Sequence, residues 1–228
     1  MATKTFFTAE DIPASYFRNN SVIEGYVTCV SDGDTMRILH EPPNTPHRSP
    51  KGRKLTEISI AVRLYGLDCP ETAKFGKPGQ PKAVEATNFS RQAILHKKVA
   101  LTPLRRDQYN RVVGIIEYHD EKCIKKKDLS LELLKRGFGV IYHGGGAEYG
   151  GKLAKMKLLE EKAKKDRIGI WEEGTHFETP GEYKAKHKND CHEGGGHPHV
   201  GRDPTTRHEK DKDGFEKVHR TRAKSHTR

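Results

Sequence analysis

SVIEGYVTCVSDGDTMRIL, residues 21–39, is the stretch that indicates how the chain begins to fold. Its first ten residues are rich in β-branched side chains and partly alternate between apolar and polar, as in a half-buried strand. Residues 31–35, SDGDT, have the composition of a tight turn, and MRIL at 36–39 resumes a strand. The stretch therefore predicts a β-hairpin.

Outward from this hairpin, the sequence predicts three more strands and three helices. After a proline-rich loop, EISIAVRLYGL at 57–67 is a β-prone run in which Arg63 interrupts the apolar residues. Strands are also expected at 97–104 and 111–118, and helices at 81–97, 130–136 and 147–166. Five short strands with a helix between the third and fourth fit a small barrel. We therefore expect an α+β, mainly β fold: a five-stranded OB-type Greek-key barrel with three helices.

Composition divides the chain into a folded domain and a polar tail. Of the 228 residues, 33% are hydrophobic and 32% are charged, which is a low apolar share for a globular chain. From residue 175 onward almost no aliphatic residue occurs, so this segment cannot bury enough apolar area to offset its ordering entropy. We expect an N-terminal extension at 1–20, one domain at 21–172, and a disordered His/Lys-rich tail at 173–228.

The formal net charge of +11 indicates an anionic partner. A basic surface attracts polyanions and raises their encounter rate, so nucleic acid or an anionic membrane is considered first. Residues 175–228 hold 12 Lys/Arg and 9 Asp/Glu, which leaves only +3 there. Most of the positive charge therefore lies on the expected domain.

The four cysteines, at 29, 69, 123 and 191, form no CxxC pair, and no signal peptide precedes them. Reduced thiols in an intracellular, soluble protein that is not secreted are therefore expected. No apolar run reaches the length of a membrane span, so we expect no transmembrane segment. A zinc cluster of Cys191, His192, His197 and His199 is the alternative for the tail, but the irregular spacing favours a solvated segment.

Three carboxylates follow strand ends that a meander of the first three strands would bring to one rim of the barrel. Asp34 leaves the first hairpin, while Asp68 and Glu71 follow the third strand. Together they would repel one another unless a cation lies between them, and hard oxygen ligands suit Ca²⁺ or Mg²⁺. The alternative is that each is an ordinary turn or strand-end residue.

Two arginines accompany these carboxylates. Arg63 lies inside an apolar run, where a charge is costly unless it is paired, although the outward face of a strand is an acceptable place for it. Arg111 opens the fifth strand after a polar turn. Two guanidiniums facing a metal site would suit phosphoryl chemistry, because they bind phosphate oxygens in pairs and stabilise charge that grows in the transition state.

Three blocks of the sequence resemble the signature blocks of the staphylococcal nuclease family, in the same order. They are DGDT at 32–35, VRLYGLDCPE at 62–71 and DQYNRVVGII at 107–116, and GIW at 169–171 is similar to the end of the family's last helix. The similarity covers about residues 20–172. It is greatest to the fungal, mitochondrially targeted endonuclease branch, through IPASYFR at 12–18, FGKPGQP at 75–81 and RRDQYNRVV at 105–113.

The resemblance implies a role for each matching residue. Asp34 and Asp68 would bind calcium through their side chains, and Cys69, where the family often has Thr or Ala, would do so through its backbone carbonyl. Glu71 would position or deprotonate the attacking water. The remaining matches concern the substrate: Arg63 and Arg111 would hold the scissile phosphate, Tyr109 and Tyr142 would lie near the terminal phosphate, and Gln108 replaces a family lysine.

These observations lead to two functional hypotheses from different classes. The first is a Ca²⁺-dependent nuclease, expected to act endonucleolytically on DNA or RNA, with a preference for single strands and with 3′-phosphate products. The second is a non-catalytic OB-type module that binds single-stranded nucleic acid. A monomer in the cytoplasm or associated with the mitochondrion is expected, although the membrane-spanning segment usual in the branch is not found ahead of the domain. A membrane-surface or protein-interaction role has no motif to support it.

Overall fold

The computed structural model describes residues 4–42, 52–74, 76–120, 125–172, 174, 177–186, 206–210 and 216–220. The chain divides into two compact units, Met1–Lys186 and His187–Arg228, which are treated separately. The first unit contains the barrel and all the residues with expected roles in catalysis or binding. The zinc alternative for the tail concerns residues 191–199, which lie outside the described residues.

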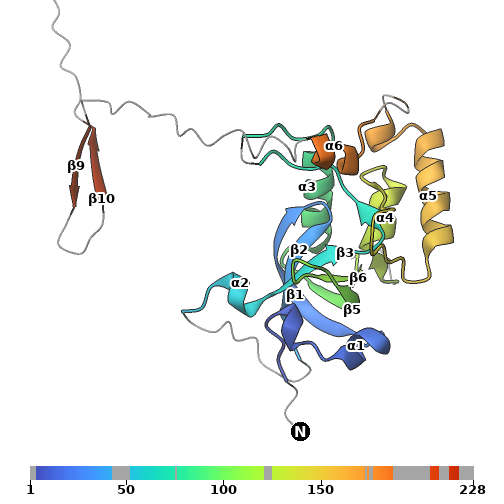
Figure 1. Ribbon diagram of the computed structural model, residues 1–228, viewed down its shortest axis with the longest axis horizontal. Coiled ribbons are helices and arrows are strands. Elements are labelled where there is room, and N and C mark those ends of the chain that lie inside the picture. The colour runs from blue at the N-terminus through green and yellow to red at the C-terminus, as the bar shows by residue number, and fades with distance from the viewer. Residues whose placement is uncertain are drawn as a thin grey trace, which may run out of the picture. The chain divides into compact units, whose positions relative to one another are not determined.

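A closed five-stranded barrel is the centre of the first unit (Figure 1). Antiparallel pairing joins β3, β2, β1, β5 and β6 in that order, and a parallel pairing of β3 with β6 closes the barrel. The prediction of an α+β barrel of OB type is confirmed. The strand bounds are Ile23–Asp32 for β1, Thr35–His40 for β2, Ile60–Leu64 for β3, Lys98–Arg106 for β5 and Val112–Tyr118 for β6.

Alternation along β3 shows how the sequence places the site on the barrel's outer surface. Ile60, Val62 and Leu64 are almost completely buried, whereas Ala61 and Arg63 between them are partly exposed. Because successive side chains of a strand point to opposite faces, the aliphatic residues fill the barrel and Arg63 points outward. The outward face, which the sequence left open as an acceptable place for Arg63, is the position observed. Three two-residue strands accompany the barrel: β4 (Leu67–Asp68), β7 (Lys127–Asp128) and β8 (Val140–Ile141).

Three helices occur where the sequence predicts them: α3 (Ala83–Ile94), α4 (Leu129–Lys135) and α5 (Leu153–Lys165). The Asp128 side chain caps α4 by accepting a hydrogen bond from the Leu131 amide, and Gly137 follows the helix with a positive φ of 64°. Helix α4 packs against both α5 and β6. Residues 147–152, expected in the last helix, instead precede α5.

Further short elements extend this plan. They are η1 (Ala9–Asp11), α1 (Ala14–Arg18), α2 (Leu55–Ile58), η2 (Gly169–Trp171) and α6 (Pro180–Lys186). Helix α2 includes residues 57 and 58, for which the sequence predicts a strand. Helix α6 lies in the segment for which disorder is predicted, and its Tyr183 is 8% exposed. Regular structure therefore continues past residue 172.

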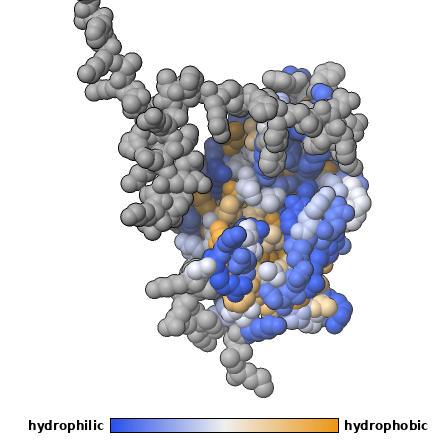
Figure 2. All heavy atoms as spheres, turned by 60° about the vertical axis from the view of Figure 1, so that its left-hand side comes forward, coloured by the Kyte–Doolittle hydropathy of each residue, from blue (hydrophilic) through white to orange (hydrophobic). Residues whose placement is uncertain are grey.

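The second unit contains one antiparallel strand pair, β9 (Thr206–Lys210) with β10 (Glu216–Arg220). On the face of the protein seen in Figure 2, hydrophilic residues predominate, with hydrophobic side chains visible between them. None of the helices formed by the described residues is long and apolar enough to cross a membrane. Cys29 and Cys69 are free thiols.

Candidate active site

The turn of the first hairpin lies against the loop that follows β4. Asp32 pairs with Thr35, so Gly33 and Asp34 form the connection between β1 and β2. A Cβ atom on Gly33 would lie 2.9 Å from the Cys69 sulfur, which is closer than such atoms approach in proteins. Glycine is therefore needed at position 33 for the turn to approach Cys69 this closely.

Asp34 and Asp68 converge on the guanidinium of Arg63. One terminal nitrogen of Arg63 lies 2.6 Å from Asp68 Oδ1 and 3.7 Å from Asp34 Oδ2. The two carboxylates are only 5% and 3% exposed. Desolvation acts to lower the pKa of Arg63, but the two carboxylates outweigh it and hold that pKa above its ordinary value. The structure thus places two buried carboxylates against the Arg63 cation.

Cys69 contributes to this cluster through its backbone. Its amide nitrogen is 3.5 Å from Asp34 Oδ2, and its side chain is 2% exposed. Burial, and then the nearby Asp34 and Asp68 charges, raise the pKa of the Cys69 thiol well above its usual range. A protonated thiol is a poor metal ligand. The backbone carbonyl is therefore the group that Cys69 can offer a hard cation.

Glu71 is positioned by Gln80. The Glu71 backbone N–H donates to the Gln80 side-chain oxygen Oε1 at 3.0 Å, and the Gln80 backbone N–H donates to the Glu71 backbone carbonyl at 2.9 Å. The Glu71 carboxylate lies 2.8 Å from the ammonium of Lys184, which is also 2.9 Å from Asp68 Oδ1. Burial acts to lower the pKa of Lys184, but these carboxylates outweigh it and raise that pKa. Lys184 in α6 thus links Glu71 to the buried aspartates.

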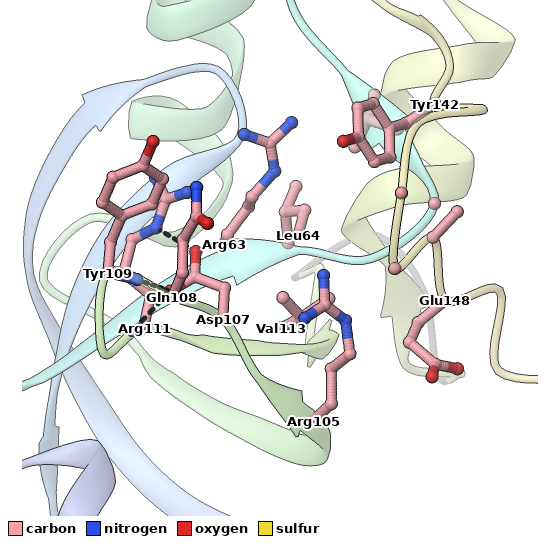
Figure 3. A pocket seen from close by; sticks show the side chains of 15 residues that line it. Arg63, Leu64, Arg105, Asp107, Gln108, Tyr109, Arg111, Val113, Tyr142 and Glu148 are labelled. Atoms are coloured by element: carbon pink, nitrogen blue, oxygen red, sulfur yellow. Dashed lines mark hydrogen bonds and ion pairs between the residues drawn. The ribbon is translucent and has the colours of Figure 1, made fainter.

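A cleft rich in arginine and tyrosine is lined by Arg63 itself (Figure 3). The Tyr142 ring centroid is 5.3 Å from the Arg63 guanidinium carbon, and Tyr109 lies at the same distance from the Arg111 carbon. Arg105 also lines this cleft, and its buried Nε has no hydrogen-bond partner among the described residues. The cleft therefore offers several guanidinium donors and two aromatic rings to one ligand.

Asp107 fixes the turn that carries Tyr109 and Arg111. Asp107 Oδ1 accepts from both backbone amides at 2.9 Å, and Oδ2 accepts from Arg111 Nε at 2.7 Å. Desolvation acts to raise the pKa of Asp107, but the hydrogen bonds from Arg111 outweigh it, so the pKa is lowered. An ionised Asp107 therefore holds Arg111 at the mouth of the cleft.

The structure brings together every site residue expected from the sequence. The carboxylate cluster contains Asp34, Asp68, Cys69 and Glu71; the cleft contains Tyr109, Arg111 and Tyr142; Arg63 belongs to both. Their chemical roles stay predictions. Sequence reasoning missed three neighbours, Gln80, Arg105 and Lys184. The helix that carries Lys184 does have a signal, because TPGE at 179–182 is a capping box with proline at the first helical position.

The donor atoms at this site suit a hard divalent ion. Within the described part of the chain, no group of three or more His, Cys, Asp or Glu side chains is arranged to hold a metal. Two carboxylates nevertheless meet at one nitrogen of Arg63, and the Cys69 backbone contacts one of them through its amide nitrogen. Carboxylate and carbonyl oxygens completed by water are the usual shell of Ca²⁺. The residues present therefore fit a calcium ion bound by two side chains rather than by a full protein cage.

Fold and site together define a small barrel protein with a carboxylate cluster beside an arginine-lined cleft. The family model described as staphylococcal nuclease homologue matches residues 61–173. Endonuclease Htp3 of Saprolegnia parasitica is 38% identical over 181 residues, covering 79% of this chain and 84% of the relative. Probable endonuclease LCL3 of Candida tropicalis is 40% identical over 185 residues, covering 78% of each chain.

Probable endonuclease LCL3 of Komagataella phaffii is 40% identical over 196 residues, covering 80% of this chain and 83% of the relative. The chain belongs to the staphylococcal nuclease homologue family. The family and the endonuclease names of these relatives support a nuclease.

Proposed function

We propose that this protein is a calcium-dependent nuclease that hydrolyses phosphodiester bonds within DNA or RNA and leaves 3′-phosphate ends. One observation carries the proposal. The Arg63 guanidinium contacts two buried carboxylates and also lines the cleft that contains Arg111 and Tyr109. A phosphate bound at Arg63 would therefore lie beside the hard oxygen donors. The cellular compartment and the monomeric state stay predictions from the sequence.

Arg63 and Arg111 are suited to hold the scissile phosphate. A guanidinium presents several donors in a fixed plane, so it can bind two phosphate oxygens at once and stabilise the additional negative charge of the transition state. Arg63 is fixed by its ion pair with Asp68, and Arg111 by its bond with Asp107. Donors that are already oriented need little reorganisation during the reaction.

Glu71 is suited to accept a proton from the attacking water. Its backbone is fixed by Gln80, and its side chain is 25% exposed, so water can reach the carboxylate. Asp34, Asp68 and the Cys69 carbonyl would hold the calcium ion. The bound ion would polarise a phosphate oxygen and favour ionisation of water. The leaving group is the 5′ oxygen of the next nucleotide, which would leave the phosphate on the 3′ side.

Single strands are the preferred substrate in this proposal. Tyr109 is 70% exposed at the edge of the cleft, so its ring is accessible to an unpaired base. Stacking on aromatic rings is the usual way in which proteins bind single strands without reading their sequence. Bases in a duplex are already stacked on one another and are not available for this contact.

A non-catalytic nucleic-acid-binding module is the second candidate function. One observation favours it: Lys184 and Arg63 already offset most of the charge of the carboxylates, so the cleft could bind a strand without cutting it. The two functions differ in one measurable property, which is cleavage that depends on a metal.

The test is incubation of the full chain with end-labelled single-stranded DNA and RNA in Ca²⁺, in Mg²⁺ or in excess chelator, followed by gel separation. We expect cleavage with Ca²⁺, much slower cleavage with Mg²⁺ because the smaller ion demands a tighter octahedron, and none with chelator. End-group analysis should find 3′-phosphate. Full cleavage in chelator would contradict the metal assignment, and binding without cleavage in every condition would support the second candidate.

A further inference from the structure

We call residues 177–186 the strap. It contains α6, which contacts the carboxylate cluster through Lys184. Thr179 and Glu182 cap the helix through reciprocal hydrogen bonds. The Tyr183 hydroxyl donates to the Pro78 carbonyl, and Gln80 Nε2 donates to the Glu178 carbonyl at 2.8 Å. Gln80 is also the residue that fixes the Glu71 backbone. The strap is therefore anchored to the same short segment that positions Glu71.

Lys184 occupies the position between carboxylates where a cation would be expected. Its ammonium lies 2.8 Å from Glu71 Oε1 and 2.9 Å from Asp68 Oδ1. The same oxygen of Asp68 also contacts Arg63 at 2.6 Å. With two cationic donors already on Oδ1, this atom cannot bind a metal ion unless one of the donors moves away. Of the two, Lys184 lies on the less firmly held element.

The formal charge of the carboxylate cluster also indicates that Lys184 occupies the position of a cation. Three carboxylates, those of Asp34, Asp68 and Glu71, face two cations, Arg63 and Lys184, which leaves a formal excess of one negative charge. Without the Lys184 ammonium, the three carboxylates would face only the Arg63 cation. The remaining excess of negative charge equals the charge of one divalent ion. A divalent cation in place of Lys184 would therefore neutralise the cluster completely, and the two are alternative counterions for the same carboxylates.

The strap is held by contacts that can be exchanged with water at modest cost. The Lys184 side chain is 41% exposed, so its ion pairs are partly solvated and individually weak. Tyr183 is the buried aromatic anchor, and Phe177 packs against Trp171 with ring centroids 6.1 Å apart. Hollows adjoin the strap at Thr179 and Gly181 and again at Phe177 and Glu178. Incomplete packing of this kind lowers the cost of local opening.

We propose that the strap is an autoinhibitory element whose Lys184 ammonium competes with a divalent cation for Asp68 and Glu71. The identity of that cation, calcium, rests on the proposed function. When the ion and the substrate phosphate bind, Lys184 leaves the cluster and the strap separates from it. Any change that releases Lys184 should then lower the calcium concentration at which the site fills.

The test is calorimetric titration of Ca²⁺ into the full chain, comparing Lys184→Met with Lys186→Ala. Met keeps most of the side-chain length without the charge. Lys186 is a matched control, because it lies on the same helix and forms an ion pair with Glu178, at 3.5 Å, outside the carboxylate cluster. Lys184→Met should tighten Ca²⁺ binding by about tenfold, the usual scale of one charged hydrogen-bonding partner, whereas Lys186→Ala should stay within about twofold.

Tyr183→Phe supplies a second variant, because it removes the hydroxyl that donates to the Pro78 carbonyl while keeping the ring, and it should tighten binding by a smaller factor. Unchanged or weaker Ca²⁺ binding in Lys184→Met would overturn the proposal. So would a fall in kcat at saturating calcium with unchanged affinity, since Lys184 would then be a catalytic residue. Tighter binding without cleavage in any protein would contradict the nuclease function but not the strap. Absence of Ca²⁺ binding in all of them would overturn both.

Discussion

The barrel rim and the strap both contact Asp68, but they are held in place by different forces. On the rim, Asp68 belongs to β4, which pairs with β8, and Arg63 belongs to β3, which pairs with strands on both sides. Ile60, Val62 and Leu64 anchor β3 in the core with at most 1% of each side chain exposed. The strap buries Pro180 and Tyr183 and packs Phe177 against Trp171, and its contacts with the carboxylate cluster are polar.

This difference separates the part of the site that must be rigid from the part that can move. Strand pairing and aliphatic burial fix Asp34, Arg63 and Asp68 relative to one another, and such preorganisation is what electrostatic catalysis requires. Polar contacts at the surface contribute little net stability, because water replaces them when they break. Substitutions on the rim should therefore change the chemistry, whereas changes in the strap should alter access to it.

The largest effect is expected from Arg63→Lys on the rim. Lysine keeps the positive charge but loses the planar pair of donors, so it cannot contact Asp68 and a phosphate in a fixed geometry. We expect kcat to fall at least roughly 10²-fold, the scale of removing one preorganised donor. Single-turnover cleavage of labelled DNA measures it. Near-normal turnover would mean that Arg63 is only a strand residue.

A smaller effect is expected from Arg105→Met, which tests the cleft on the rim's other side. Arg105 lines the cleft beside Arg63, and its Nε has no partner in the part of the chain that the structure describes, so a bound phosphate could complete its hydrogen bonds. Removing it should raise KM for single-stranded DNA by about tenfold with little change in kcat. Arg53→Met, at an exposed ion pair with Glu57, is the control. Equal KM values in the two variants would remove Arg105 from the substrate site.

The smallest effect is expected from shortening the chain, which compares the strap with the second unit. Removing residues 187–228 should leave the melting temperature unchanged, because the first unit ends at Lys186. Removing residues 176–228 also removes the packing of Phe177 and Tyr183, so the melting temperature should fall by roughly 3–8 °C while the barrel stays folded and active. Matched melting curves decide this. A fall in melting temperature after removal of residues 187–228 alone would mean that the second unit stabilises the barrel.

Most of the barrel could be predicted from the sequence, because local signals and the fold agree there. The β-prone run that contains Arg63 and the SDGDT turn place Arg63 and Asp34 correctly, since strand propensity and turn chemistry are local properties. The exact position of Tyr142 could not be predicted, because β8 has only two residues and pairs with β4 far earlier in the chain. A strand of two residues is too short to show a periodic pattern in the sequence.

The strap shows a second limit of sequence reasoning. Its composition is that of a polar tail, yet TPGE at 179–182 begins a helix whose anchoring depends on one hydroxyl and one amide. A few long-range polar contacts do not change average composition. The proximity of Lys184 to Glu71, 113 positions apart in sequence, can be found only from the structure.

The central claim, that the carboxylates and arginines form a hydrolytic site, is tested most directly by Glu71→Gln. Gln is nearly isosteric, so barrel packing and both arginines should survive, while the ability to take a proton from water is lost. Calcium-dependent cleavage and binding of single-stranded DNA are measured on the same preparation. We predict that cleavage falls roughly 10²-fold or more while binding persists or tightens slightly, because a charge that repels phosphate has been removed. Unchanged cleavage in Glu71→Gln would contradict the account.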